Sequence, residues 1–284
     1  MKIQHFFDEP TATLSYVVWD EDARVAVLID SLLDFDPKSG RTCTRSCEAV
    51  ARFLDERRLS LTLVLDTHAH ADHLTGMPFF RERYGARTGI GAEIRQVQAI
   101  FRRIFNLGDA FPVDGSQFDV LLREGDVLAA GPLRVEAIHT PGHTPACMSY
   151  RIGDALFVGD GLFMPDYGTA RCDFPGGSAE ALYDSIQRLY TLPEATRVFT
   201  CHDYRPGGRP LRFESTIGEQ KRTNVQLSHA TTRAAFIELR KTRDAGLEMP
   251  TLILPSIQVN IRAGRLPEPE SNGISYLKIP LNGV

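Results

Sequence analysis

The sequence predicts an α/β protein in which strands and helices alternate. Short runs of β-branched and aromatic residues, such as TLSYVVWD (13–20) and RVAVLID (24–30), are typical of strands. The segment SAEALYDSIQRLYTL (178–192) is apolar at helical spacing, and Ser178 is its candidate N-cap. Histidines and aspartates also recur where apolar runs end, which is typical of a site built at the edge of a sheet.

The elements follow in order along the chain. The first two apolar runs are joined by the polar turn EDA and predict a hairpin. Further strands are predicted at LTLVLDT (61–67), FDVLL (118–122), LRVEAIHT (133–140), CMSYRI (147–152), ALFVGD (155–160) and RVFTCHD (197–203). Helices are predicted over residues 43–58, 76–84, 93–105, 178–192, 218–227 and 231–245.

The last part of the chain has a different composition. From Pro250 onwards it is rich in proline, which predicts an extended segment and no second folded unit. We therefore predict a catalytic domain over residues 1–249 and a C-terminal extended tail over residues 250–284, packed on the same domain.

Composition narrows the class of protein. The 284 residues are 43% hydrophobic and 24% charged, as in globular domains, and the net charge of −4 argues against a broad nucleic-acid-binding surface. No apolar run approaches the ~20 residues that span a bilayer, so no membrane association is predicted. Five cysteines, an odd number, do not indicate a disulfide framework, and a reducing cytoplasmic location is expected.

The stretch THAHADH (67–73) carries the strongest chemical signal. Three of the eight histidines and one aspartate fall within it: His68, His70, Asp72 and His73. Imidazole and carboxylate ligands together suit zinc and iron, among other metals. Further ligand-type residues follow later strands, namely His139, His143, Asp160 and His202. The sequence therefore predicts a metal site where these strand ends meet.

These motifs resemble those of the metallo-β-lactamase superfamily. THAHADH resembles its H-x-H-x-D-H signature, HTPGHT (139–144) its second motif, GD (159–160) its third, and CHDY (201–204) its last histidine motif. The resemblance implies an αββα sandwich of two mixed β-sheets flanked by helices, with the metal site at the sheet edge.

Within this superfamily the resemblance leaves two metal arrangements open. A glyoxalase II type of thioesterase would hold two zinc(II) ions per chain: His68, His70 and His143 on the first, Asp72, His73 and His202 on the second, and Asp160 between them. The persulfide dioxygenase type holds one iron(II) per chain through His68, His143 and Asp160. His70, Asp72, His73, His139 and His202 would then surround these three ligands.

Three stretches resemble the persulfide dioxygenase branch. They are LIDSLLDFDPKSGR (28–41), GDGLFMPDYGTARCDFPGG (159–177) and the C-terminal series CHDYRPGG, TIGEQKRTNVQL and LPSIQVNIRAG. The implied reaction converts glutathione persulfide, dioxygen and water into glutathione and sulfite. A sulfurtransferase is a possible partner, and a homodimer is a possible assembly. The dinuclear zinc thioesterase is the alternative, and a non-catalytic sulfur carrier of the same fold is a third interpretation.

Several further residues are candidates for contact with the substrate. Tyr204 is expected near the metal, where it could hydrogen-bond a bound oxygen species, unless it is buried against a backbone carbonyl. Because glutathione carries carboxylates, Arg171 is the first candidate to bind it, and Lys221 and Arg222 are weaker ones. Gln226 stands where better-known mitochondrial members of the branch carry a basic residue, which is a departure from the family pattern.

Overall fold

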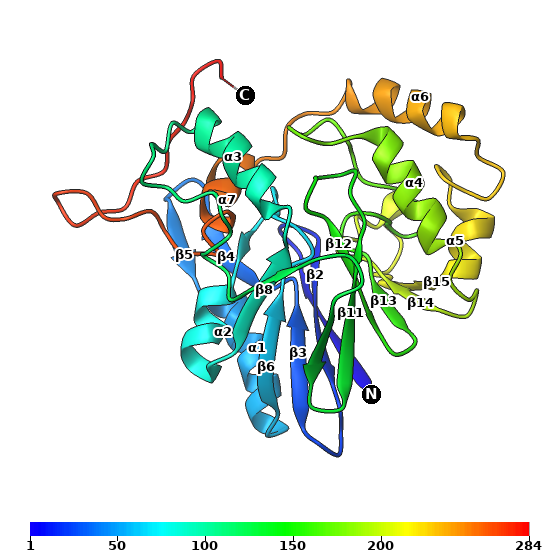
Figure 1. Cartoon of the computed structure of the whole chain (residues 1–284), viewed down its shortest axis with the longest axis horizontal. Coiled ribbons are helices and arrows are strands. Elements are labelled where there is room, and N and C mark those ends of the chain that lie inside the picture. Colours follow the sequence, from blue (N-terminus) through cyan, green and yellow to red (C-terminus); the bar gives the residue numbers. More distant parts are fainter. Residues whose placement is uncertain (284) are drawn as a thin grey trace.

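The computed structural model describes residues 1–283, which form four layers (Figure 1). Two β-sheets face each other in the middle, and helices cover the outer face of each sheet. The predicted αββα sandwich of two mixed sheets is therefore confirmed.

The first sheet contains six strands in the order β1-β2-β3-β6-β8-β9. They are β1 (Lys2–Asp8), β2 (Thr13–Trp19), β3 (Val25–Ile29), β6 (Ser60–Leu65), β8 (Arg87–Gly91) and β9 (Val120–Leu122). The predicted hairpin is the antiparallel β2/β3 pair, whereas β3, β6, β8 and β9 run parallel to one another.

The second sheet has the order β10-β11-β12-β13-β14-β15. Its strands are β10 (Val127–Ala130), β11 (Leu133–His139), β12 (Met148–Ile152), β13 (Ala155–Phe157), β14 (Arg197–Phe199) and β15 (Glu214–Thr216). Only β13 and β14 pair in parallel. A small third sheet joins β4 (Leu32–Asp36) to β5 (Arg41–Cys43) and β7 (Leu74–Thr75).

The helices divide between the two outer layers. Those on the first sheet are α1 (Arg45–Glu56), α2 (Met77–Tyr84), α3 (Ile94–Ile104) and α7 (Ile253–Asn260), and those on the second are α4 (Ala179–Leu189), α5 (Ile217–Thr223) and α6 (Arg233–Asp244). Ser178 is the N-cap of α4, as predicted, and accepts a hydrogen bond from the Ala181 backbone N–H. No helix within residues 1–283 is both long and apolar enough to cross a bilayer.

The middle of the sandwich is a dry core built from the inner faces of both sheets. Tyr16, Val18 and Val27 from the first sheet belong to the same buried cluster as Tyr150 and Phe157 from the second. Alternate residues along a strand point to opposite faces, so each strand sends one set of side chains into this core. The rigid pair of sheets fixes where the strands end, and the site is built there.

The C-terminal part differs from its prediction. Residues 250–284 were predicted to be extended, but Ile253–Asn260 forms α7 and is buried against the first layer. Pro255 lies in the first turn of this helix, where its missing N–H removes no hydrogen bond, so the proline is compatible with the helix. The prediction also missed several strands, most of them short or largely polar: β1, β4, β5, β7, β8, β10 and β15.

Candidate metal centre

The predicted ligands converge from four strand ends. The loop after β6 carries His68, and the loop after β11 carries His143. Asp160 follows β13, and His202 follows β14. All four side chains are buried, although they lie up to 134 positions apart in the sequence, from 68 to 202. The strand-end pattern therefore locates one common site.

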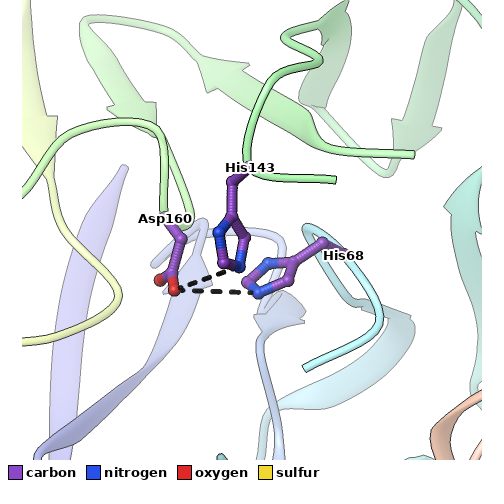
Figure 2. Close-up of side chains that lie close together, drawn as sticks. All are labelled: His68, His143 and Asp160. Carbon is purple, nitrogen blue, oxygen red and sulfur yellow. Dashed lines mark ion pairs between the residues drawn. The ribbon is translucent and has the colours of Figure 1, made fainter. Parts of the chain in front are cut away.

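His68, His143 and Asp160 form a compact group (Figure 2). Asp160 Oδ2 lies 3.6 Å from His143 Nε2 and 3.9 Å from His68 Nε2. One potential ligand atom from each residue falls within 4.8 Å of the others. Two imidazoles and one carboxylate in this arrangement can hold one metal ion and leave coordination positions free.

The two histidine rings of this group are oriented by contacts of their Nδ1 atoms. His143 Nδ1 donates to the Arg171 carbonyl oxygen over 2.8 Å, because a carbonyl can only accept, so Nε2 carries the free lone pair. His68 Nδ1 lies 3.0 Å from the Thr67 hydroxyl. Gly159 allows the third ligand to approach, since its φ is +51° and an added Cβ would lie 2.5 Å from Thr67 Oγ1.

Asp30 connects the two halves of the THAHADH loop. Its Oδ1 accepts the Thr67 backbone N–H at 2.6 Å and lies 3.0 Å from His70 Nε2. His70 thus directs Nε2 towards a carboxylate and keeps Nδ1 free. Burial lowers the pKa of both His68 and His70 well below the usual histidine value, so both rings are neutral. Neutral imidazole is the form that binds a metal.

A second set of ligand-type residues lies beside the first. His202 Nε2 is 3.3 Å from Asp160 Oδ1 and 3.4 Å from Asp72 Oδ2. Burial opposes protonation of His202, yet these two carboxylates raise its pKa above the usual value. The Nδ1 atoms of His73 and His202 lie 3.5 and 3.4 Å from the Thr13 hydroxyl, so both rings turn Nε2 away from it.

The residues present fit a metal ion. Within residues 1–283, His68 Nε2, His73 Nε2, His202 Nε2 and Asp160 Oδ1 are buried and have no hydrogen-bond partner. Leaving a buried polar atom unpaired costs about 1–3 kcal/mol, so four such atoms in one place need an explanation. A cation held by His68 Nε2 and Asp160 would satisfy two of them, and a second cation beside Asp72 would satisfy His73 Nε2 and His202 Nε2, because each atom is of a metal ligand type.

A cavity of about 530 Å³ opens onto this site. Its lining includes the polar residues His143, Asp160 and Asp72, and much of the wall is apolar or aromatic: Phe35, Phe163, Phe174, Tyr167, Tyr204 and Leu252. Tyr204 stacks on His202 and is 44% exposed, and no hydrogen bond of its hydroxyl is found among residues 1–283. The interpretation of Tyr204 as buried against a carbonyl therefore does not hold, and its hydroxyl is free to meet a ligand.

The structure separates the predicted substrate-binding cations. Arg171 lines the cavity, but its guanidinium is held by Asp173 through two hydrogen bonds of 2.6 Å. Lys221 and Arg222 lie on α5, away from the cavity wall, and pair with Glu194. These two weaker candidates are thus not brought to the site, because α5 packs on the outside of the second sheet.

His139 supports the site from a distance. Its Nε2 donates to the Pro145 carbonyl oxygen over 2.9 Å, within the loop that carries His143. It touches no other predicted ligand among the described residues, so it braces this loop and does not enter the metal centre.

Gln226 has an unexpected neighbour. Its Oε1 accepts from Arg240 over 2.7 Å and from the Thr169 hydroxyl over 3.0 Å. Arg240 is only 1% exposed, lines the cavity and pairs with Asp244. A buried cation from α6 therefore lies directly beside Gln226.

Sequence reasoning missed Asp30, Arg240 and Asn260. Asp30 ends the apolar run RVAVLID, so the strand-end rule that found Asp160 applied to it as well. Arg240 and Asn260 lie within helices, where polar residues normally face solvent, and nothing in their local sequence marks them as buried.

Comparison with known proteins identifies relatives of this architecture. A family model described as the metallo-beta-lactamase superfamily matches residues 8–202. A probable metallo-hydrolase of Burkholderia pseudomallei is 50% identical over 100% of both chains. A Dictyostelium discoideum protein named glyoxylase B2 is 47% identical over 99% of this chain and 97% of its own. The chain spans 65% of the length of the beta-lactamase hydrolase-like proteins of Xylella fastidiosa, which are 47% identical.

More distant relatives carry a different name. The human mitochondrial persulfide dioxygenase ETHE1 is 28% identical over 92% of this chain and 88% of its own. The crystal structure of ETHE1 from Myxococcus xanthus superposes with a TM-score of 0.75, covering 93% of this chain and 100% of that one at 33% identity.

Proposed function

Because this chain belongs to the metallo-β-lactamase superfamily, we propose that it is an iron(II)-dependent persulfide dioxygenase. The reaction is glutathione persulfide plus O2 and water giving glutathione, sulfite and two protons. The two sulfur atoms of the persulfide together lose four electrons and O2 accepts them, so no further reductant is needed. The observation that carries this proposal is the compact group of His68, His143 and Asp160, two of which, His143 and Asp160, line the cavity.

The donor set suits this metal. Two imidazoles and one carboxylate are the ligand set of non-haem iron(II) oxygenases, whereas zinc has no redox chemistry to offer dioxygen. Bound iron(II) supplies the electron transfer between the substrate sulfur and dioxygen. The chain holds the ligand side chains in position: the Arg171 carbonyl fixes the His143 ring, and Thr67 contacts the His68 ring.

The side chains of the cavity wall provide apolar surface, a hydroxyl group and a cation for the substrate. Phe163 and Phe174 line the space next to the ligands and limit the access of water. The Tyr204 hydroxyl, which has no other partner among the described residues, can donate a hydrogen bond to the substrate. Arg243 also lines the cavity and has no ion-pair partner within residues 1–283, so it is the cation best placed for a glutathione carboxylate.

The direct test combines metal analysis with oxygen uptake. Protein loaded with iron should contain about one iron per chain and consume dioxygen when glutathione persulfide is added, releasing sulfite in equal amount. Stoichiometric zinc in the native protein, with no oxygen uptake after iron loading, would contradict the proposal.

Ligand variants separate the two metal arrangements. His143→Ala and Asp160→Ala should each abolish iron binding, whereas His202→Ala should leave most of it. The reason is that His202 approaches Asp160 through Oδ1, on the side away from the His143 contact at Oδ2. Equal loss of iron in all three variants would refute the assignment of the three ligands.

A dinuclear zinc thioesterase of the glyoxalase II type is the second candidate. It is favoured by the unpaired Nε2 atoms of His73 and His202 beside Asp72, and by the hydrolase and glyoxylase names of the 50% and 47% identical relatives. Two adjacent metals would activate a water molecule for attack on a thioester. Rapid hydrolysis of S-lactoylglutathione by protein holding two zinc ions per chain would establish this function in place of the first.

A further inference from the structure

One residue of the C-terminal helix holds the ligand loop by its backbone. Asn260, the last residue of α7, is 2% exposed. Its Nδ2 donates to the carbonyl oxygens of His70 and His73, each over 2.8 Å. Its Oδ1 accepts the Thr75 backbone N–H over 2.9 Å. These three bonds use both amide hydrogens and the amide oxygen.

The bonds connect parts of the chain that no regular structure joins. Between the end of β6 at Leu65 and the start of β7 at Leu74, the ligand loop belongs to no helix or strand. A loop that belongs to no sheet lacks strand-to-strand hydrogen bonds, so its buried carbonyl groups need donors from other parts of the protein. Asn260 satisfies two of them, on either side of Asp72, and so fixes the direction of the backbone between His70 and His73.

The helix that carries Asn260 is itself fastened on two sides. Gln98 on α3 donates to the Ile261 carbonyl oxygen over 2.9 Å. On the other side, Gln258 and Lys278 exchange two hydrogen bonds of 2.9 Å, one from the Gln258 amide and one from the Lys278 backbone N–H. Asn260 therefore reaches the ligand loop from a fixed position.

We propose that Asn260 is a positioning residue of the metal centre, and that α7 is thereby part of it. Loss of the two donated bonds frees the segment that carries His70, Asp72 and His73, and the polar wall around the metal is no longer held in one geometry. This inference requires that the site binds a metal. In the two-zinc arrangement the held segment carries three ligands, and in the one-iron arrangement it follows the ligand His68 within the same loop.

The experiment measures cobalt(II) binding, which reports affinity and coordination geometry without turnover. Asn260→Ala removes all three bonds. Asn260→Asp keeps an acceptor for Thr75 but cannot donate when ionised. Both should weaken cobalt(II) affinity, measured by competition with a chelator, by about 10- to 100-fold, the usual cost of losing a group that orients metal ligands. Both should also shift the visible absorption bands of bound cobalt(II).

Gln258→Ala is the matched control. It also removes three hydrogen bonds of a side-chain amide on α7, to Leu254 and Lys278, but none of these reaches the ligand loop. It should lower the melting temperature of the metal-free protein. It should leave cobalt(II) affinity and absorption unchanged, because the Gln98 bond to the Ile261 carbonyl oxygen still holds the end of α7 that carries Asn260.

Unchanged cobalt(II) binding in the Asn260 variants would overturn the proposal. If both Asn260 variants bind cobalt(II) with the wild-type affinity and spectrum, as the control does, Asn260 only stabilises the fold. Asn260→Ser keeps one hydrogen-bonding group and leaves a smaller cavity than Asn260→Ala does. It replaces Asn260→Ala in the same measurements if the alanine variant does not fold. A failure of oxygen uptake would refute the proposed dioxygenase function and would leave this result unaffected.

Discussion

Removing the carboxylate of Asp244 tests how the cavity wall is stabilised. Asp244 pairs with Arg240, and both side chains are at least 95% buried. Its second oxygen accepts the Cys172 backbone N–H over 2.8 Å. In Asp244→Ala, the Arg240 guanidinium keeps its bonds to Thr169 and Gln226 but loses its counter-charge.

The expected magnitude follows from these contacts. Breaking a buried ion pair by removing one partner costs about 3–5 kcal/mol, because the remaining charge is uncompensated. The unpaired Cys172 N–H adds about 1–3 kcal/mol. The free energy of unfolding should therefore fall by at least about 4 kcal/mol, a large part of the roughly 5–15 kcal/mol of a typical protein.

Urea unfolding measures this loss. Trp19 is the single tryptophan and packs edge-on against Phe53, so its fluorescence reports the folded first layer. The control is the double variant Arg240→Met with Asp244→Leu, which removes both charges and should recover much of the loss. A loss below about 1 kcal/mol in the single variant, or equal instability of single and double variants, would refute this reasoning.

Three further outcomes are expected. Gly142→Ala should destabilise the protein by about 2–4 kcal/mol in thermal melts, because at φ +146° the added Cβ would lie 2.4 Å from the α4 backbone. Gly85→Ala is the control and should cost much less in the same melts, because at φ +65° no atom lies within 4 Å of the added Cβ. In the native protein near pH 8, Ellman's reagent should label the exposed Cys43 and spare Cys47. Burial raises the Cys47 pKa to about 12, so its thiolate and its labelling should increase with pH, and fast labelling of both at pH 8 would contradict this. Tyr204→Phe should retain metal and fold but lower the turnover of glutathione persulfide about 100-fold, and unchanged turnover would exclude a role for its hydroxyl.

Local patterns were enough to predict which ligand-type residues come together and most of the secondary structure. His68, His143, Asp160 and His202 each follow a short apolar run, and the shortness and β-branched content of these runs favour buried strands over helices. The family motifs then supplied the order of the sandwich, which apolar periodicity alone does not contain.

The support around the ligands could not be predicted in the same way. Asn260 reaches carbonyls 190 and 187 positions earlier in the chain, and Arg240 reaches Thr169 across 71 positions. Such contacts depend on how whole layers pack, and no local pattern encodes them. Lys221 and Arg222 illustrate the converse, because a motif placed them near the substrate whereas the packing of α5 directs them to Glu194.

The position of Asn260 has a consequence for how the protein is made. A chain is synthesised from its N-terminus, and domains begin to fold as they emerge. His68, His143, Asp160 and His202 all precede Asn260, so every ligand is already translated while the backbone between His70 and His73 still lacks two of its hydrogen-bond donors. The hydrogen bonds that hold this loop are therefore completed only after α7 has been synthesised.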